Sequence, residues 1–193
     1  EFVASGWSIK HMHRVIMNSW AYQQTGRTSD TRLQQAGKVP PSYSYFPRRR
    51  LSSERIRDAL LFVADRLDSR MYGKPVRPAL PPKFGTRYTW DESKSAADRS
   101  RRSVYIHAKR NLPYPLLKVF DQPDMHESCA RRDRTTVAPQ ALMLFNSELV
   151  LGFARALAER ARRESQSTDP ASTARRAWWL ALGREPATGE LQD

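Results

Sequence analysis

The segment SSERIRDALLFVADRL, residues 52–67, carries the clearest helical pattern in this chain. Ser52 can cap a helix, and Glu54 follows in the first turn. Apolar residues then recur at i, i+3, i+4, i+7, i+8 and i+11, and they are Ile56, Ala59, Leu60, Val63, Ala64 and Leu67. This spacing places them on one stripe, so the segment predicts an amphipathic helix that faces a core.

Other segments outside this helix carry capping residues, apolar stripes or a proline in the first turn. They predict helices over Ile9 to about Tyr22, Pro115–Phe120 and Pro139–Phe145, a longer helix capped by Asn146 or Ser147 that runs to about Arg163, and a helix from Pro170 up to Gly183. Ser103–His107 is predicted to be one short strand. The expected fold class is therefore mainly α, an irregular helical domain with long proline-rich loops and at most a small β element.

The composition predicts packed helices joined by polar loops. The chain has 193 residues, 39% of them hydrophobic, with 13 Pro and 8 Gly, which is typical of one domain rich in loop, or of one domain with an appendage. Residues 1–164 are expected to form most of that domain, and 165–193 a short linker and the terminal helix. Residues 68–100 are polar and contain a cluster of prolines, so we expect a flexible insertion there.

Several kinds of protein are excluded by simple counts. The single cysteine, Cys129, allows no internal disulfide and no Cys-rich metal cluster. No apolar run approaches the roughly 20 residues that span a bilayer.

The sequence begins at Glu1 without a Met, and a helix start near Thr188 is followed by only a few residues. We therefore expect a fragment of a longer protein.

The charge of the chain predicts an acidic partner. Lys and Arg number 33 against 20 Asp and Glu, a net charge of +13, which favours nucleic acid, anionic lipid or acidic polysaccharide. The residues expected to form one basic surface are Arg49, Arg50, Arg101, Arg102, Arg131 and Arg132. Two alternatives stay open: a merely solvated basic face, and pairing of the cluster Arg48–Arg50 with Glu54 and Asp58.

One loop gathers side chains that are able to do acid–base or nucleophilic chemistry. The candidate catalytic residues are Asp121, Asp124, His126 and Cys129. Their spacing matches no zinc or cytochrome signature, and the alternative is a structural loop with a buried thiol. His11 and His13 are two residues apart on a predicted helix and point to different faces, so we expect no metal and no cofactor. For Trp178 and Trp179 we expect core packing of at least one ring.

The dense segment RRSVYIHAKRNLPYPLLKVFDQPDMHESCARRDRTTVAPQALMLFNS, residues 101–147, carries a family resemblance together with GWSIK at 6–10, PRRRLSSERIRDAL at 47–60 and RRAWWLALGREP at 175–186. These motifs resemble the C-terminal part of the planctomycete-specific domain of unknown function, which is found beside planctomycete-type cytochrome c domains. The resemblance implies export to the periplasm or the extracellular space, because haem is attached to c-type cytochromes outside the cytoplasm. It implies no catalytic residue, and without Cys-x-x-Cys-His the chain should carry no haem.

Charge and resemblance together predict an exported accessory domain of a multidomain protein that binds sulfated or carboxylated polysaccharide through its basic face. One alternative is a hydrolase or lyase that acts on such a polysaccharide with the loop from Asp121 to Cys129. Another is a scaffold that positions a cytochrome c domain. Nucleic-acid binding would explain the charge, but it conflicts with export and lacks a recognisable motif.

Overall fold

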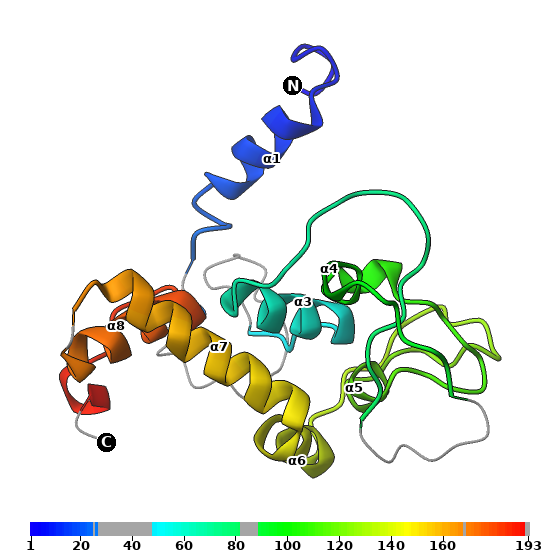
Figure 1. Ribbon diagram of the computed structural model, residues 1–193. Helices are drawn as coiled ribbons and strands as arrows, with labels where there is room; N and C mark the ends of the chain where they lie inside the picture. The colour runs from blue at the N-terminus through cyan, green and yellow to red at the C-terminus, as the bar shows by residue number, and fades with distance from the viewer. Residues whose placement is uncertain (25, 27–47, 82–88, 168, 192–193) are drawn as a thin grey trace. The chain divides into compact units, whose positions relative to one another are not determined.

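The computed structural model describes residues 1–24, 26, 48–81, 89–167 and 169–191. The chain divides into two compact units, Glu1–Arg50 and Leu51–Asp193. The described residues are mostly helical, and their only β pairing is two isolated bridges. The predicted mainly α fold is confirmed (Figure 1).

The first unit contains helix α1, Ile9–Met17, whose N-cap Ser8 accepts a hydrogen bond from the backbone N–H of His11 at 3.2 Å. The prediction that this helix reaches Tyr22 is wrong. Ser19 Oγ donates to the carbonyl oxygen of Ile16 at 2.6 Å and accepts from the N–H of Tyr22 at 3.3 Å. These local bonds replace those that would continue the helix. The sequence loses helical periodicity over residues 23–47 and holds several Gly and Pro there, which predicts a loop. Within that range the structure describes only residues 23, 24 and 26.

The core of the second unit is built by α3, Ser53–Val63, α5, Pro115–Val119, α6, Ala138–Asn146, and α7, Glu148–Ser165. One buried cluster joins α3 and α7 and consists of Leu61, Ala64, Phe153 and Ala156. A second cluster surrounds α5 and consists of Tyr114, Leu116, Leu117 and Phe120. Leu60 and Leu149 pack against both clusters. Helix α3 therefore links the two parts of the core, and it lies beside α7 in Figure 1.

The buried stripe of α3 differs from the predicted one. Leu61 and Ala64 are 2% and 4% exposed, and Arg57 is 2% exposed, whereas Leu60 and Val63 are only half-buried. The buried residues Arg57, Leu61 and Ala64 are spaced i, i+4, i+7, so they form one helical stripe. The apolar pattern predicts that Leu60 and Val63 are buried, and the structure buries them only in part. The pattern also misses Arg57, because it counts an arginine as a solvent-facing residue.

Residues 68–81 and 89–107 contain no regular strand. They contain α4, Ala96–Arg99, a 3₁₀ turn at Ser103–Tyr105, and parallel bridges between Asp68 and Arg101 and between Val76 and Ile106. The predicted strand at Ser103–His107 is wrong. The backbone N–H of Ser103 donates to Asp58 Oδ1 at 2.7 Å, a tertiary contact that takes it away from any ladder.

The described parts of 68–100 pack against the following segment. Within the range, Arg70 pairs with Asp98 at 2.9 Å. The ring of Trp90 stacks on that of Tyr114 in the following segment, with centroids 6.3 Å apart. The predicted flexibility of this insertion stays a prediction.

Helix α8, Pro170–Leu182, has the predicted start and end. Asp169 is its N-cap and accepts hydrogen bonds from the N–H groups of Ala171 and Ser172, both at 3.1 Å. Gly183 closes the helix with φ +67°, a left-handed conformation that a glycine adopts without a steric penalty. Helix α8 packs on α7, and the 3₁₀ turn Thr188–Leu191 follows it.

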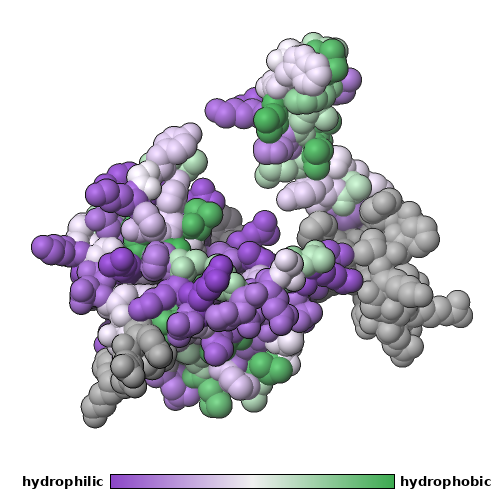
Figure 2. Space-filling model, turned by 90° about the vertical axis from the view of Figure 1, so that its right-hand side faces the viewer, coloured by the Kyte–Doolittle hydropathy of each residue, from purple (hydrophilic) through white to green (hydrophobic). Residues whose placement is uncertain are grey.

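Hydrophilic side chains predominate on the face drawn in Figure 2. Some apolar side chains are nevertheless exposed, among them Leu142 and Phe145 of α6, at 61% and 78%. None of the described helices alone is long and apolar enough to cross a membrane. Helices α6 and α7 together reach that length and composition, but the pair is bent by 56°.

Candidate functional site

A surface hollow of about 340 Å³ opens between the end of α7 and one face of α8. Its lining consists of Ser165, Ser172, Arg175, Arg176, Trp179 and Glu185. The four lining residues of α8 are spaced i, i+3, i+4, i+7, so they share one side of the helix. Ser165 is the last residue of α7, and the turn at Gly183 brings Glu185 back to the same hollow.

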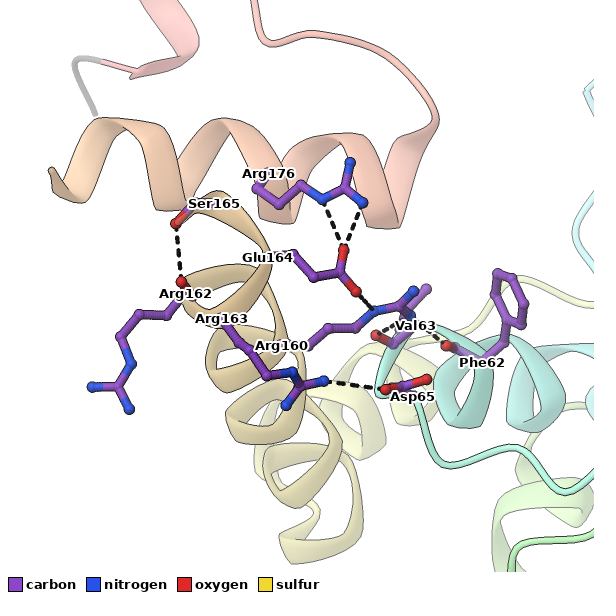
Figure 3. Close-up of polar contacts among 9 residues, drawn as sticks. All are labelled: Phe62, Val63, Asp65, Arg160, Arg162, Arg163, Glu164, Ser165 and Arg176. Carbon is purple, nitrogen blue, oxygen red and sulfur yellow. Dashed lines mark hydrogen bonds and ion pairs between the residues drawn. The ribbon is translucent and has the colours of Figure 1, made fainter. Parts of the chain in front are cut away.

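Arg176 is held in place by Glu164 of α7. Its Nε and Nη2 donate to Glu164 Oε2 at 2.9 Å and 2.5 Å. The other oxygen, Oε1, accepts from Arg160 Nε at 2.7 Å. Figure 3 shows this carboxylate between the two guanidinium groups. Hydrogen bonds from Arg160 and from Arg176 lower the pKa of Glu164, so this carboxylate is charged at neutral pH.

Arg160 extends the network to a third helix. Its Nη1 donates to the carbonyl oxygens of Phe62 and Val63, at 2.9 Å and 3.2 Å, at the C-terminal end of α3. Nearby, Arg163 pairs with Asp65 at 3.1 Å (Figure 3). The wall of the hollow is therefore anchored through α7 to α3, which carries part of the core.

Arg175 differs from Arg176 in having no such partner. It is exposed, and no hydrogen bond or ion pair joins it to a residue that the structure describes, although its charge is near enough to Asp169 to help lower the pKa of that carboxyl. Trp179 beside it is 47% exposed. Trp178, on another side of α8, is half-buried, and the guanidinium carbon of Arg184 lies 5.7 Å from the centre of its ring. The hollow thus combines an unpaired cation with an accessible aromatic ring.

The remaining lining groups favour ligand hydroxyls. Ser165 Oγ donates to the carbonyl oxygen of Arg162 at 3.1 Å, and Ser172 Oγ donates to Asp169 Oδ2 at 3.0 Å. Both hydroxyl oxygens keep lone pairs that are able to accept. Glu185 adds a carboxylate, which is an acceptor only. The site suits a ligand with one acidic group, several hydroxyls and an apolar face.

Arg101, which was expected on the basic surface, is inside the fold. It is 5% exposed, and its guanidinium donates to the carbonyl oxygens of Lys74 and Arg70, at 3.1 Å and 3.3 Å, and to that of Tyr72. It also stacks on the ring of Tyr105, 3.9 Å from the centroid. Arg101 therefore holds the segment around residue 72, and it is unavailable to a ligand in this conformation.

Two of the other predicted arginines are paired with acidic residues. Arg132 is bound by Glu54, with distances of 2.7 Å and 2.9 Å, and Arg102 lies 3.9 Å from Asp58. The two acids proposed to neutralise Arg48–Arg50 thus pair with these arginines. Arg131 and Arg49 are exposed, and Arg50 is half-buried. Arg49 and Arg50 belong to the first unit, the others to the second.

The candidate catalytic residues of the 121–129 loop make local hydrogen bonds. Asp121 accepts from the N–H and the hydroxyl of Thr135 at 2.7 Å and 2.9 Å, and Asp124 accepts from the N–H of His126 at 2.9 Å. Cys129 is exposed, so the alternative of a buried thiol is wrong. Across the ranges that the structure describes, no three His, Cys, Asp or Glu side chains form a group suited to a metal ion.

The hollow was not predicted from the sequence, although a signal for it exists. The pattern S-x-x-R-R-x-x-W at residues 172–179 puts a hydroxyl, two cations and an indole on one side of a helix. The tryptophans were instead weighed as core residues. Because the hollow also needs Ser165 and Glu185 from outside α8, the pattern alone does not define it.

A family model described as "PSD1: Protein of unknown function (DUF1553)" matches residues 1–193. The chain belongs to this family, and the predicted membership in a domain family of unknown function is confirmed. No curated protein and no solved structure matches the chain. The family assigns no role to any residue, so the function has to be argued from the geometry of the site.

Proposed function

We propose that this chain is a binding domain for acidic polysaccharide, and that the hollow on α8 holds one unit of the polymer. The observation that carries the proposal is the unpaired guanidinium of Arg175 beside the exposed indole of Trp179. A guanidinium binds carboxylate or sulfate oxygens with two parallel hydrogen bonds. An indole offers a rigid apolar surface to the C–H face of a sugar ring.

The net charge of +13 supports the same proposal at longer range. A basic protein attracts a polyanion before contact, and the attraction is screened by salt. Arg49, Arg102 and Arg131 are exposed and add to this field. Arg101 does not belong with them, because its charge is enclosed by backbone carbonyl groups.

The proposed setting is the periplasm or the extracellular space, where the chain would serve as an accessory domain of a longer, multidomain protein. The support for this setting is the family resemblance. Fractionation of cells that make the full-length protein tests it, with recovery in the cytoplasmic fraction as the contradicting result. The hydrolase or lyase alternative gains no support from the described residues, since Asp121 and Asp124 are held in local hydrogen bonds and do not line the hollow.

The test is a binding series at several salt concentrations with carboxylated, sulfated and neutral polysaccharides and with DNA. We expect an acidic polysaccharide to bind more tightly than the neutral one and than DNA, and Arg175→Ala to weaken that binding. Loss of one anion contact should flatten the salt slope by about one unit or less. Arg155→Ala, which removes an exposed arginine of α7 outside the hollow, is the charge-matched control. Equal binding to every polyanion, with the same small effect of both variants, would contradict the proposal.

A further inference from the structure

The two arginines of the hollow are unequal, and this inequality decides where an acidic ligand group binds. Arg176 already gives Nε and Nη2 to Glu164, whose negative charge compensates it. Arg175 keeps all of its donors free of protein partners among the described residues. The charge of Asp169 offsets that of Arg175 only without a hydrogen bond. An anion therefore gains most at Arg175, because no hydrogen-bonded ion pair has to be broken there.

Glu185 limits how much negative charge the hollow accepts. It is exposed and lines the same space as the two arginines. A second anionic group on the same sugar would approach Glu185 and be repelled, whereas a sugar hydroxyl would donate to it. The serine hydroxyls of Ser165 and Ser172 have their protons engaged and also favour ligand hydroxyls. The lining is therefore matched to one acidic group and several free hydroxyls.

The size of the hollow agrees with a single sugar. Its volume of about 340 Å³ is at the small end of the range of roughly 300–1,000 Å³ found for ligand pockets. Trp179 provides one ring-sized platform, and the hollow is open to solvent, so neighbouring units of a polymer are able to continue outside it.

We infer that the hollow recognises a uronate, a sugar with one carboxylate and free ring hydroxyls, in preference to a heavily sulfated sugar. This inference rests on the binding function proposed above. The carboxylate binds Arg175, the sugar ring stacks on Trp179, and the ring hydroxyls donate to Glu185 and to the two serine oxygens. Arg176, oriented by Glu164, forms the wall.

The test uses the chain of residues 1–193 and three oligosaccharides of equal length: an oligouronate, its carboxyl-reduced form, in which each carboxylate is a primary alcohol, and a heavily sulfated one. Calorimetry at fixed salt measures the affinities. We expect carboxyl reduction to weaken binding about tenfold or more, the loss of one charge-assisted contact. Arg175→Ala should weaken oligouronate binding to a similar extent and leave the weak binding of the reduced form unchanged.

Two further variants separate the parts of the site. Trp179→Ala should weaken the oligouronate and its reduced form by similar factors, because stacking does not depend on the carboxylate. Glu185→Gln should strengthen binding of the sulfated ligand several-fold and not that of the oligouronate. All of these residues are exposed or half-buried, and unchanged circular dichroism and Tm confirm that each variant folds.

The outcomes distinguish this inference from the function on which it rests. Tighter binding of the sulfated ligand, lost in Arg175→Ala, would overturn the uronate assignment and leave acidic-polysaccharide binding standing. Oligouronate binding that is indifferent to Arg175 and Trp179 would overturn the assignment of the hollow. If neither acidic ligand binds better than the reduced one, both the inference and the proposed function are wrong.

Discussion

Arg57 of α3 donates a hydrogen bond from Nη1 to the backbone carbonyl oxygen of Arg101, 2.9 Å away and 44 residues later in the chain. The same guanidinium donates to the carbonyl oxygen of Arg99 at 2.6 Å and to Ser103 Oγ at 3.2 Å. Burial lowers the pKa of Arg57, and the nearby Tyr114 and Asp58 oppose this effect. Arg57 thus ties α3 to the loop that follows α4.

Replacing Arg57 by Met should therefore destabilise the fold. The carbonyl groups of Arg99 and Arg101 would be left without this donor, at about 1–3 kcal/mol for each buried group, so the free energy of unfolding should fall by about 2–5 kcal/mol in urea denaturation. Arg55→Met, at an exposed position of the same helix, is the control and should change it by less than about 0.5 kcal/mol. Equal effects of the two variants would show that the buried contacts contribute nothing.

The buried stripe of α3 predicts opposite results for two neighbouring residues. Leu61 is 2% exposed and Phe62 is 61% exposed. Leu61→Ala should lower the free energy of unfolding by about 2–5 kcal/mol, because it leaves a cavity between α3 and α7. Phe62→Ala should lower it by less than about 1 kcal/mol, and chemical denaturation measures both. A larger effect at Phe62 would mean that the helix faces the core with its other side.

The link between α7 and α8 should be sensitive to acid. Hydrogen bonds from Arg160 and Arg176 lower the pKa of Glu164 below its ordinary value of 4.5. The unfolded chain therefore takes up this proton first, so the stabilisation is complete above about pH 4.5 and is lost as the pH falls through the lowered pKa of the folded state.

The difference in Tm between the wild-type chain and Glu164→Gln measures this effect. It should be largest near neutral pH and shrink as the pH falls below 4.5. Glu159→Gln, at an exposed position of α7 with no ion pair among the described residues, should show no comparable pH dependence. A constant difference for Glu164→Gln across the acid range would contradict the proposed role of its charge.

The single thiol should react in the folded protein. Cys129 is exposed, and its Sγ lies 3.2 Å from the carbonyl oxygen of Arg131. An aromatic disulfide reagent should modify one thiol per chain without denaturant, at a rate within about tenfold of the rate for the unfolded chain, because access is not limited by the fold. A thiol that reacts only in denaturant would contradict the exposure of Cys129.

Local signals predicted most helices correctly. Pro115 and Pro170 lie in the first turns of α5 and α8, Ser147 is the N-cap of α7, and Gly183 ends α8. Each of these signals acts within about one helical turn, so it can be recognised from the sequence alone. The end of α1 was missed because the side chain of Ser19 competes for backbone hydrogen bonds.

The candidate site was less predictable than the helices. The charge of the chain and the pair Arg175–Arg176 are visible in the sequence. Which of the two is hydrogen-bonded to a carboxylate depends on Glu164, which belongs to another helix. Similarly, Arg101 and Arg102 are adjacent in sequence and were assigned one role, yet only Arg102 is exposed.

The sequence by itself determined the family, the mainly helical class, the basic charge and the bounds of several helices, because these depend on composition and on residues within a turn of one another. Tertiary structure alone decided that Arg57 and Arg101 are buried, that Leu61 faces the core, and that Arg175 is the arginine left for a ligand. The physical reason is that a guanidinium is stable away from water only where several acceptors converge on it. Those acceptors are carbonyl groups and a carboxylate from distant segments, which meet only when the helices pack.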